Sequence, residues 1–111
     1  MREGAVALAA LPQADGSRKN RPVILLRQLP PFGDWLVCGV STQLRQHVAR
    51  FDELIENSAP DFLSSGLKAS SVIRLGFLAV LSEANLIGVI GLISQERHRQ
   101  LLNRLSEHLS A

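Results

Sequence analysis

An arginine in front of a proline and a pair of hydroxyl residues are the parts of this chain best suited to act on a phosphate group. Arg21 opens the run Arg-Pro-Val-Ile-Leu-Leu, and Ser41 and Thr42 close the run Asp34–Thr42. A guanidinium stays charged at every relevant pH and its planar fork matches two phosphate oxygens, while a hydroxyl can hydrogen-bond the same group. Taken alone, each feature is more typical of a surface ion pair or of a strand end bonded to its own backbone.

A polar stretch at residues 13–20 is a second candidate for contacts to phosphate. It contains Ser17, Arg18, Lys19 and Asn20, whose side chains suit such contacts. The same composition, with Asp15-Gly16 in front, is equally typical of a flexible, solvated hairpin loop. The sequence favours neither interpretation.

The other reactive or aromatic side chains form no catalytic or metal-binding pattern. His98 and His108 fall in the last segment and His47 stands alone, so we expect structural or solvated histidines and keep only His47 as a candidate acid or base. Trp35 could stack a base, but a lone tryptophan in a strand is more often core. No spacing of Asp, Glu, His or Cys indicates metal ligands. We therefore expect no metal and no cofactor.

Charge is unevenly distributed along the 111 residues, although the net charge is only +2. Residues 1–50 carry seven Lys and Arg against three Asp and Glu, whereas residues 51–74 carry two against four. An anionic ligand is therefore expected to meet the first half of the chain. The alternative is that these charges only keep the surface soluble.

The composition is that of a folded protein without a membrane-spanning segment. The hydrophobic fraction is 46% and the charged fraction 20%, so we expect one domain over residues 1–111 with an ordinary core. The apolar runs 5–11 and 86–93 are too short to cross a bilayer. Cys38 is the only cysteine, which excludes an internal disulfide and fits a reducing compartment. These features predict a soluble, cytoplasmic protein with no membrane partner and a buried Cys38.

Short β-like runs separated by turn residues dominate the first 93 residues. We expect strands over 5–11, 21–26 with Pro22 at the start, 34–42, 62–63, 72–75, 77–81 and 86–93, with a loop over 13–20 and turns over 29–33 and 64–68. Gly39 is expected at a bulge or a close backbone approach, and Gly76 at a kink. Residues 43–60 fit neither a helix nor a loop clearly and stay open.

The last segment changes to helical spacing. Ser94 is a candidate N-cap, and an apolar stripe follows at Leu101, Leu102, Leu105 and Leu109. The opposite, solvated face is expected to carry Arg97, Arg99, Gln100, Asn103, Arg104 and Glu107. Short strands followed by one helix predict a small barrel or strongly curved sheet with a C-terminal helix packed on it.

Four short segments, each weak alone, are specific as a set because of their order and spacing. They are Arg21–Leu26, Val40–Gln43, Ser65–Lys68 with Ser71–Arg74, and Val89–Ser94. They resemble, in turn, the Arg-Pro-Val motif, the hydrophobic-Thr-Ser-Gln element, the Gly-Leu turn with its Ser-Val strand, and the last strand of MazF/PemK toxins. The chain resembles this family over nearly its whole length.

The resemblance implies a fold, partners and site residues. The fold would be an SH3-like small barrel of the MazF/Kid/CcdB type with a C-terminal helix. The protein would form a homodimer, bind a cognate antitoxin, and hold single-stranded RNA in a groove along the dimer interface. The family's catalytic arginine falls on Arg21 and its catalytic hydroxyl residue on Ser41, with Thr42 and Gln43 beside it as substrate-binding residues. Ser17, Arg18 and Lys19, from the polar stretch described above, are further candidates for binding substrate.

The activity implied by the resemblance is metal-independent cleavage of RNA. The 2′-hydroxyl of RNA can attack the neighbouring phosphorus, leaving a 2′,3′-cyclic phosphate and a 5′-hydroxyl. Such an enzyme has to supply in-line geometry and to stabilise charge on the phosphorane oxygens. Arg21 suits the second task and is a poor general base, because it does not lose its proton. Ser41 would orient the phosphate.

Two departures from the family pattern keep other functions open. Ala5 and Ala10 stand where family members often have acidic residues, so the chain could be a degenerate member that binds RNA or an antitoxin without cutting. A CcdB-like, protein-binding gyrase poison is the other alternative. Such poisons depend on particular C-terminal residues, and the bland end Leu109-Ser110-Ala111 favours the nuclease.

Overall fold

The chain forms six strands and two α-helices, which the computed structural model describes over all of residues 1–111. The strands are β1 (Ala5–Pro12), β2 (Arg18–Leu29), β3 (Asp34–Ser41), β4 (Glu53–Ile55), β5 (Ser71–Leu81) and β6 (Leu86–Leu92). The α-helices are α1 (Phe62–Ser65) and α2 (Gln95–Leu109), and the 3-10 turns are η1 (Leu44–Gln46) and η2 (Glu83–Asn85). Neither α-helix is long and apolar enough to span a membrane.

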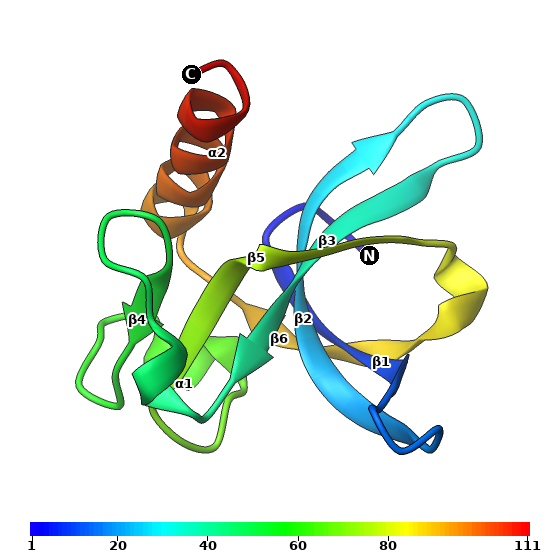
Figure 1. The fold of residues 1–111 in the computed structure, drawn as a ribbon, viewed down its shortest axis with the longest axis horizontal. Helices are drawn as coiled ribbons and strands as arrows, with labels where there is room; N and C mark the ends of the chain where they lie inside the picture. The colour runs from blue at the N-terminus through cyan, green and yellow to red at the C-terminus, as the bar shows by residue number, and fades with distance from the viewer.

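The strands make one antiparallel sheet in the order β4-β5-β3-β2-β1-β6. The pairing shifts register between Val6 and Ala7 in β1, between Leu25 and Arg27 in β2, and beside Gly39 in β3. Such irregularities increase the local twist and bend the strands. Figure 1 shows the strands curling round, with the long β2–β3 hairpin projecting on one side and α2 standing on the other.

The curled sheet is buried on both faces, because alternate residues of a strand point to opposite sides. One core joins β1 and β2 to Leu101 and Leu105 of α2, through Val6, Ile24 and Leu26. The second core contains Trp35 and Leu86 with residues from the other face of β1, β2 and β3: Ala5, Ala7, Ala9, Leu11, Val23, Leu25 and Val37. Because Trp35 and Leu86 belong to strands that are not neighbours, the sheet closes around this second core.

Helix α1 packs against β6, one edge of the sheet. Ser64 Oγ donates to the carbonyl of Leu92 at 3.1 Å. Gly91 lies against the carbonyls of Ser64 and Ser65 so closely that a Cβ there would collide with them. This contact fixes the start of the segment Gly66–Ser71, which becomes one wall of the cavity described below.

Helix α2 starts where the sequence predicts, but two arginines on its expected solvated face turn inward. Ser94 Oγ accepts the Arg97 backbone N–H at 3.1 Å, as an N-cap does. The Arg97 side chain donates from Nε and Nη2 to the Asp61 carboxylate at 2.8 and 3.1 Å, and from Nη1 to Glu53 at 3.0 Å. Arg104 also donates to the Asp52 carbonyl at 2.7 Å. The predicted solvated face is therefore wrong for Arg97 and Arg104.

We expect Asp61→Asn to lower the free energy of unfolding by about 2 kcal/mol, because it weakens two hydrogen bonds of the mostly buried Arg97 guanidinium and leaves Glu53 as its only charged partner. Asp61 and Arg97 have side chains only 6% and 15% exposed. Urea unfolding followed by circular dichroism measures the change. Glu107→Gln, on the exposed side of the same helix, is the matched control and should change stability by less than about 0.5 kcal/mol.

The same ion pair predicts how the free energy of unfolding depends on pH in acid. Burial raises the pKa of Asp61, but the hydrogen bonds from Arg97 and from the Ser94 N–H outweigh it and hold the pKa below its usual value. A carboxyl whose folded pKa is lowered stabilises above its unfolded pKa, about 3.9, and loses that contribution as pH falls through the folded value. Wild-type stability should therefore decline more steeply below about pH 4 than that of Asp61→Asn. If the free energies of unfolding of wild type and Asp61→Asn fell in parallel below this pH, Asp61 would not be the group responsible.

Most predicted elements are confirmed, and a few differ in type or bounds. Residues 62–63 are not a strand: they lie in α1, where the Ser65 N–H donates to the Asp61 carbonyl at 3.1 Å. The predicted loop 13–20 is shorter, because β2 already begins at Arg18 and pairs with β1. Pro22 is inside β2 rather than at its start, next to the point where pairing with β3 ends. The open region 43–60 contains η1 and β4.

Candidate functional site

A cavity of about 770 Å³ opens where β2 and β3 stop pairing. Its walls come from β1, β2, β3, β5 and β6 together with the segments that follow β1, β3 and α1. It is lined by Leu8, Leu11, Pro12, Gln13, Ala14, Asn20, Arg21, Pro22, Gly39, Val40, Ser41, Thr42, Gln43, Gln46, Gly66, Leu67, Lys68, Ala69, Ser71, Arg74, Phe77 and Ile90.

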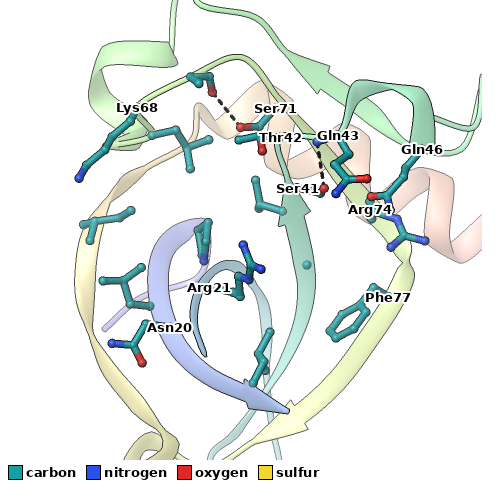
Figure 2. A pocket seen from close by; sticks show the side chains of 18 of the residues that line it. Asn20, Arg21, Ser41, Thr42, Gln43, Gln46, Lys68, Ser71, Arg74 and Phe77 are labelled. Carbon is teal, nitrogen blue, oxygen red and sulfur yellow. Dashed lines mark hydrogen bonds between the residues drawn. The ribbon is translucent and has the colours of Figure 1, made fainter. Parts of the chain in front are cut away.

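The structure brings Arg21 and Ser41 together in this cavity. Strands β2 and β3 pair as far as Val23 opposite Gly39. Two residues beyond that pair, the same register places Arg21 across from Ser41, and residues two apart in a strand point to the same face. Figure 2 shows Arg21 pointing into the middle of the cavity, with Ser41 on the neighbouring strand. An arginine and a hydroxyl from separate strands therefore share one solvent-filled space.

Both side chains keep hydrogen-bonding capacity for a ligand. Ser41 Oγ accepts the Gln43 N–H at 3.1 Å, which leaves its own proton free to donate. Ser41 is thus bonded to backbone, as the bland interpretation expected, and can still donate a hydrogen bond to a ligand. The only hydrogen bond of the Arg21 guanidinium is a long one, from Nη2 to Gln13 Oε1 at 3.5 Å. Thr42 and Gln43 also line the cavity, as the sequence predicted.

The cavity is cationic, because three basic side chains line it and no carboxylate does. Besides Arg21, these are Lys68 and Arg74. Arg74 is on β5 and pairs with Gly39 of β3. The sequence predicted only the first half of the chain to meet an anion, so Lys68 and Arg74 were missed. Both lie inside segments that resemble the family, and this resemblance could have identified them as site residues.

The net negative charge of residues 51–74 did not indicate an anion site, although three of its acidic side chains are bonded to groups outside the cavity. Glu53 and Asp61 pair with Arg97 of α2. The Asp52 carboxylate accepts the backbone N–H groups of Val48 and Leu75, each at 3.0 Å. None of these carboxylates lines the cavity, so the positive charge that faces it is not neutralised.

Two buried polar atoms beside Arg21 and Ser41 have no protein partner. They are Arg74 Nε and Gln46 Oε1. Figure 2 places Arg74 and Gln46 on the same side of the cavity. A buried donor without a partner costs free energy unless a ligand or water satisfies it. Arg74 therefore lines the cavity with a donor that the protein itself leaves unsatisfied.

Three residues predicted to bind substrate lie outside the cavity lining. Ser17 donates from its hydroxyl to Asp15 Oδ1 at 2.6 Å, and this bond is the main reason that the pKa of Asp15 is lowered. Arg18 donates to the Ala10 carbonyl at 3.0 Å. Lys19 pairs through its backbone with Leu11 and is exposed. Their turn adjoins the rim, where Gln13, Ala14 and Asn20 line the cavity in their place.

The histidines, the cysteine and the tryptophan belong to the structure rather than to the cavity. Nε2 of His98 donates to the Leu26 carbonyl at 2.7 Å, and Nε2 of His47 donates to the Asp52 carbonyl at 3.3 Å. Burial raises the pKa of the Cys38 thiol, so it stays protonated. Trp35 is only 2% exposed and is core, as expected. His47 does not line the cavity, so we give it no role as an acid or base there.

The arrangement can hold a phosphodiester and carry its negative charge. Two guanidiniums and an ammonium face a space whose remaining walls are amides, hydroxyls and apolar side chains. Groups of this kind stabilise charge that develops on phosphate oxygens without taking a proton. The structure brings no three residues among His, Cys, Asp and Glu together in a geometry that could hold a metal ion.

Comparisons with known proteins show the family and the fold of the chain. The chain matches the sequence profile of a family described as "PemK-like, MazF-like toxin of type II toxin-antitoxin system" over residues 2–109. No curated protein sequence matches it. Among solved structures, the Mycobacterium tuberculosis toxin MazF-mt6 matches with a TM-score of 0.70 and 17% identity, over 96% of each chain. This likeness confirms the predicted fold, a mainly β sheet with a C-terminal helix.

Proposed function

This chain belongs to the PemK-like, MazF-like family of type II toxins, and we propose that it is a metal-independent endoribonuclease that cuts single-stranded RNA. The observation that carries the proposal is the meeting of Arg21 and Ser41 in a cavity lined by three cations and no carboxylate. Attack by the 2′-hydroxyl of the RNA itself would give a 2′,3′-cyclic phosphate and a 5′-hydroxyl. Such a reaction needs geometry and charge stabilisation rather than a bound metal.

Four polar side chains of the cavity would act on the scissile phosphate. Arg21 stabilises the phosphorane oxygens, because its exposed guanidinium points into the cavity with only one long hydrogen bond. Ser41 donates its free proton to the scissile phosphate and fixes its orientation. Arg74, whose Nε has no partner, supplies a second guanidinium. Lys68 adds a point charge at the opposite wall, as Figure 2 shows.

The neighbouring residues would hold the rest of the strand. Thr42 and Gln43 follow Ser41 along the cavity wall and offer a hydroxyl and an amide to the sugar or a base. Lys19 is exposed beside the rim and is placed to meet a phosphate further along the RNA. Ser17 and Arg18 are already bonded within their turn, so we assign them a weaker contribution.

The proposal includes partners as well as a substrate. As a type II toxin, the protein would be held inactive by a cognate antitoxin in the cytoplasm. We also propose a homodimer, which exposed apolar side chains on β5 and β6 support: Val80, Ile87 and Val89 are 56%, 58% and 47% exposed. Light scattering at micromolar protein concentration measures the oligomeric state. A monomer would count against an RNA groove that spans two subunits.

The experiment that tests the activity uses purified protein and single-stranded RNA in excess EDTA. We expect cutting to continue at the rate seen without the chelator, and the downstream fragments to carry a 5′-hydroxyl. The ends are read by testing whether the fragments accept a label from polynucleotide kinase without prior dephosphorylation. Intact RNA, or fragments with a 5′-phosphate, would reject the proposed reaction. Intact RNA with retained binding would instead favour the degenerate alternative.

A further inference from the structure

One aromatic ring faces the cavity, and the reaction proposed above does not use it. Phe77 is the only aromatic residue of the lining and is 39% exposed. The other large aromatic side chains are engaged or distant: Trp35 and Phe62 are in the cores, and Phe51 packs on the His108 ring at 4.8 Å. An exposed aromatic ring in a cationic cavity suits a ligand that carries both a negative charge and an apolar face.

A bulge in β5 is what turns Phe77 toward the cavity. Strand β5 pairs with β3 through Arg74 opposite Gly39 and then through Leu78 opposite Cys38, so residues 75–77 have no opposite partner. Bulges of this kind re-aim side chains and are common beside active sites. The bulge follows directly after Arg74. It therefore places the ring next to the guanidinium whose Nε lacks a partner.

Gly39 makes room for the ring. A Cβ at Gly39 would lie 3.0 Å from Cδ1 and 3.2 Å from Cγ of Phe77, which is closer than a packed methyl normally comes. The ring thus covers the backbone of β3 two residues before Ser41, roughly 7 Å along an extended strand. A base resting on the ring would belong to a nucleotide adjoining the phosphate at Ser41.

We propose that Phe77 is the stacking platform for the base beside the scissile phosphate, and that it thereby positions the RNA and helps to set where the cut falls. This inference rests on the proposed function, because it needs RNA in the cavity. Every base has an apolar π-face, so an aromatic ring binds single strands without requiring one sequence. The bulge, the glycine and the adjacent Arg74 together give the ring a fixed place relative to the cleaved bond.

The test is an abasic scan on an oligonucleotide that the protein binds but does not cut. The cut site is mapped first, and a 2′-deoxy nucleotide then replaces the one that carries the attacking hydroxyl. Removing one base at a time should reveal a single position beside the cut where wild-type affinity falls about tenfold. Phe77→Ala should weaken binding of the intact oligonucleotide by a similar factor. In that variant, removing the same base should cause no further loss.

Three further variants separate stacking from general packing. Phe77→Tyr should keep the affinity because it keeps the π-face, whereas Phe77→Leu should lose it. Gly39→Ala should reproduce the loss of Phe77→Ala by displacing the ring. Phe32→Ala is the matched control, because Phe32 is 87% exposed and lies outside the cavity lining. It should bind as the wild type does.

The outcomes distinguish this inference from the proposed function. Wild-type protein that binds and cuts RNA, but shows the same abasic scan as Phe77→Ala, would refute the stacking role alone. Equal affinity of Phe77→Leu and wild type would do the same, as would loss of the homodimer in Phe77→Ala. A wild-type protein that neither binds nor cuts RNA would refute the proposed function itself.

Discussion

Replacing Arg21 with alanine should lower the rate of RNA cleavage by about 10²–10³-fold, the usual cost of losing one preorganised group that stabilises transition-state charge. The Arg21 side chain is exposed and makes only one long hydrogen bond, so the free energy of unfolding should change by less than about 0.5 kcal/mol. The rate is measured in single turnover with saturating enzyme, so that weaker binding does not contribute. Expression of the variant should no longer arrest growth.

Two variants show whether the charge or its geometry matters at Arg21. Arg21→Lys keeps the charge but loses the planar fork, so it should restore only part of the lost rate. Arg27→Ala is the matched control: Arg27 is on the same strand, is 58% exposed, and pairs with Glu3 away from the cavity. It should cut at the wild-type rate. An unchanged rate in Arg21→Ala would remove Arg21 from the chemistry.

The regular parts of the fold could be predicted because they depend on local patterns. Short apolar runs bounded by turn residues placed β1 and β6 within a residue or two, and Ser94 with its leucine stripe placed α2. The failures lie where distant residues decide. Residues 62–63 are as apolar as a strand, yet they form a helical turn held by contacts of α1 with β6. No local pattern reveals such a contact.

The candidate site was predictable in part, for a related reason. Arg21 and Ser41 were found through family-like segments, and their meeting follows from the β2–β3 register, which a sequence does not show. Lys68 and Arg74 were masked by acidic neighbours, because counting charges along the chain ignores that Glu53 and Asp61 are paired with Arg97. Phe77 depends on a bulge and on the missing Cβ of Gly39. The charge and the shape of this site depend on ion pairs and strand register between residues that are distant in the sequence.

The largest effect is expected from the substrate rather than from the protein. The cavity lining contains no carboxylate, imidazole or thiol, so it offers neither a base of ordinary strength to activate water nor a ligand set for a metal ion. The nucleophile most available to this cavity is the 2′-hydroxyl of the RNA, which is delivered by the bound strand itself.

Replacing that single 2′-hydroxyl by hydrogen, at the nucleotide on the 5′ side of the cut, should therefore abolish cleavage. Affinity should stay within about twofold of the RNA value, because phosphate contacts and base stacking are unchanged. The experiment compares two synthetic oligonucleotides that differ by one oxygen atom, incubated with protein in excess EDTA, and measures both cleavage and binding. A third oligonucleotide, with the same substitution two nucleotides away, is the control and should be cut normally. Continued cutting of the first deoxy oligonucleotide would mean that another nucleophile attacks, and the roles proposed for Arg21 and Ser41 would then have to be abandoned.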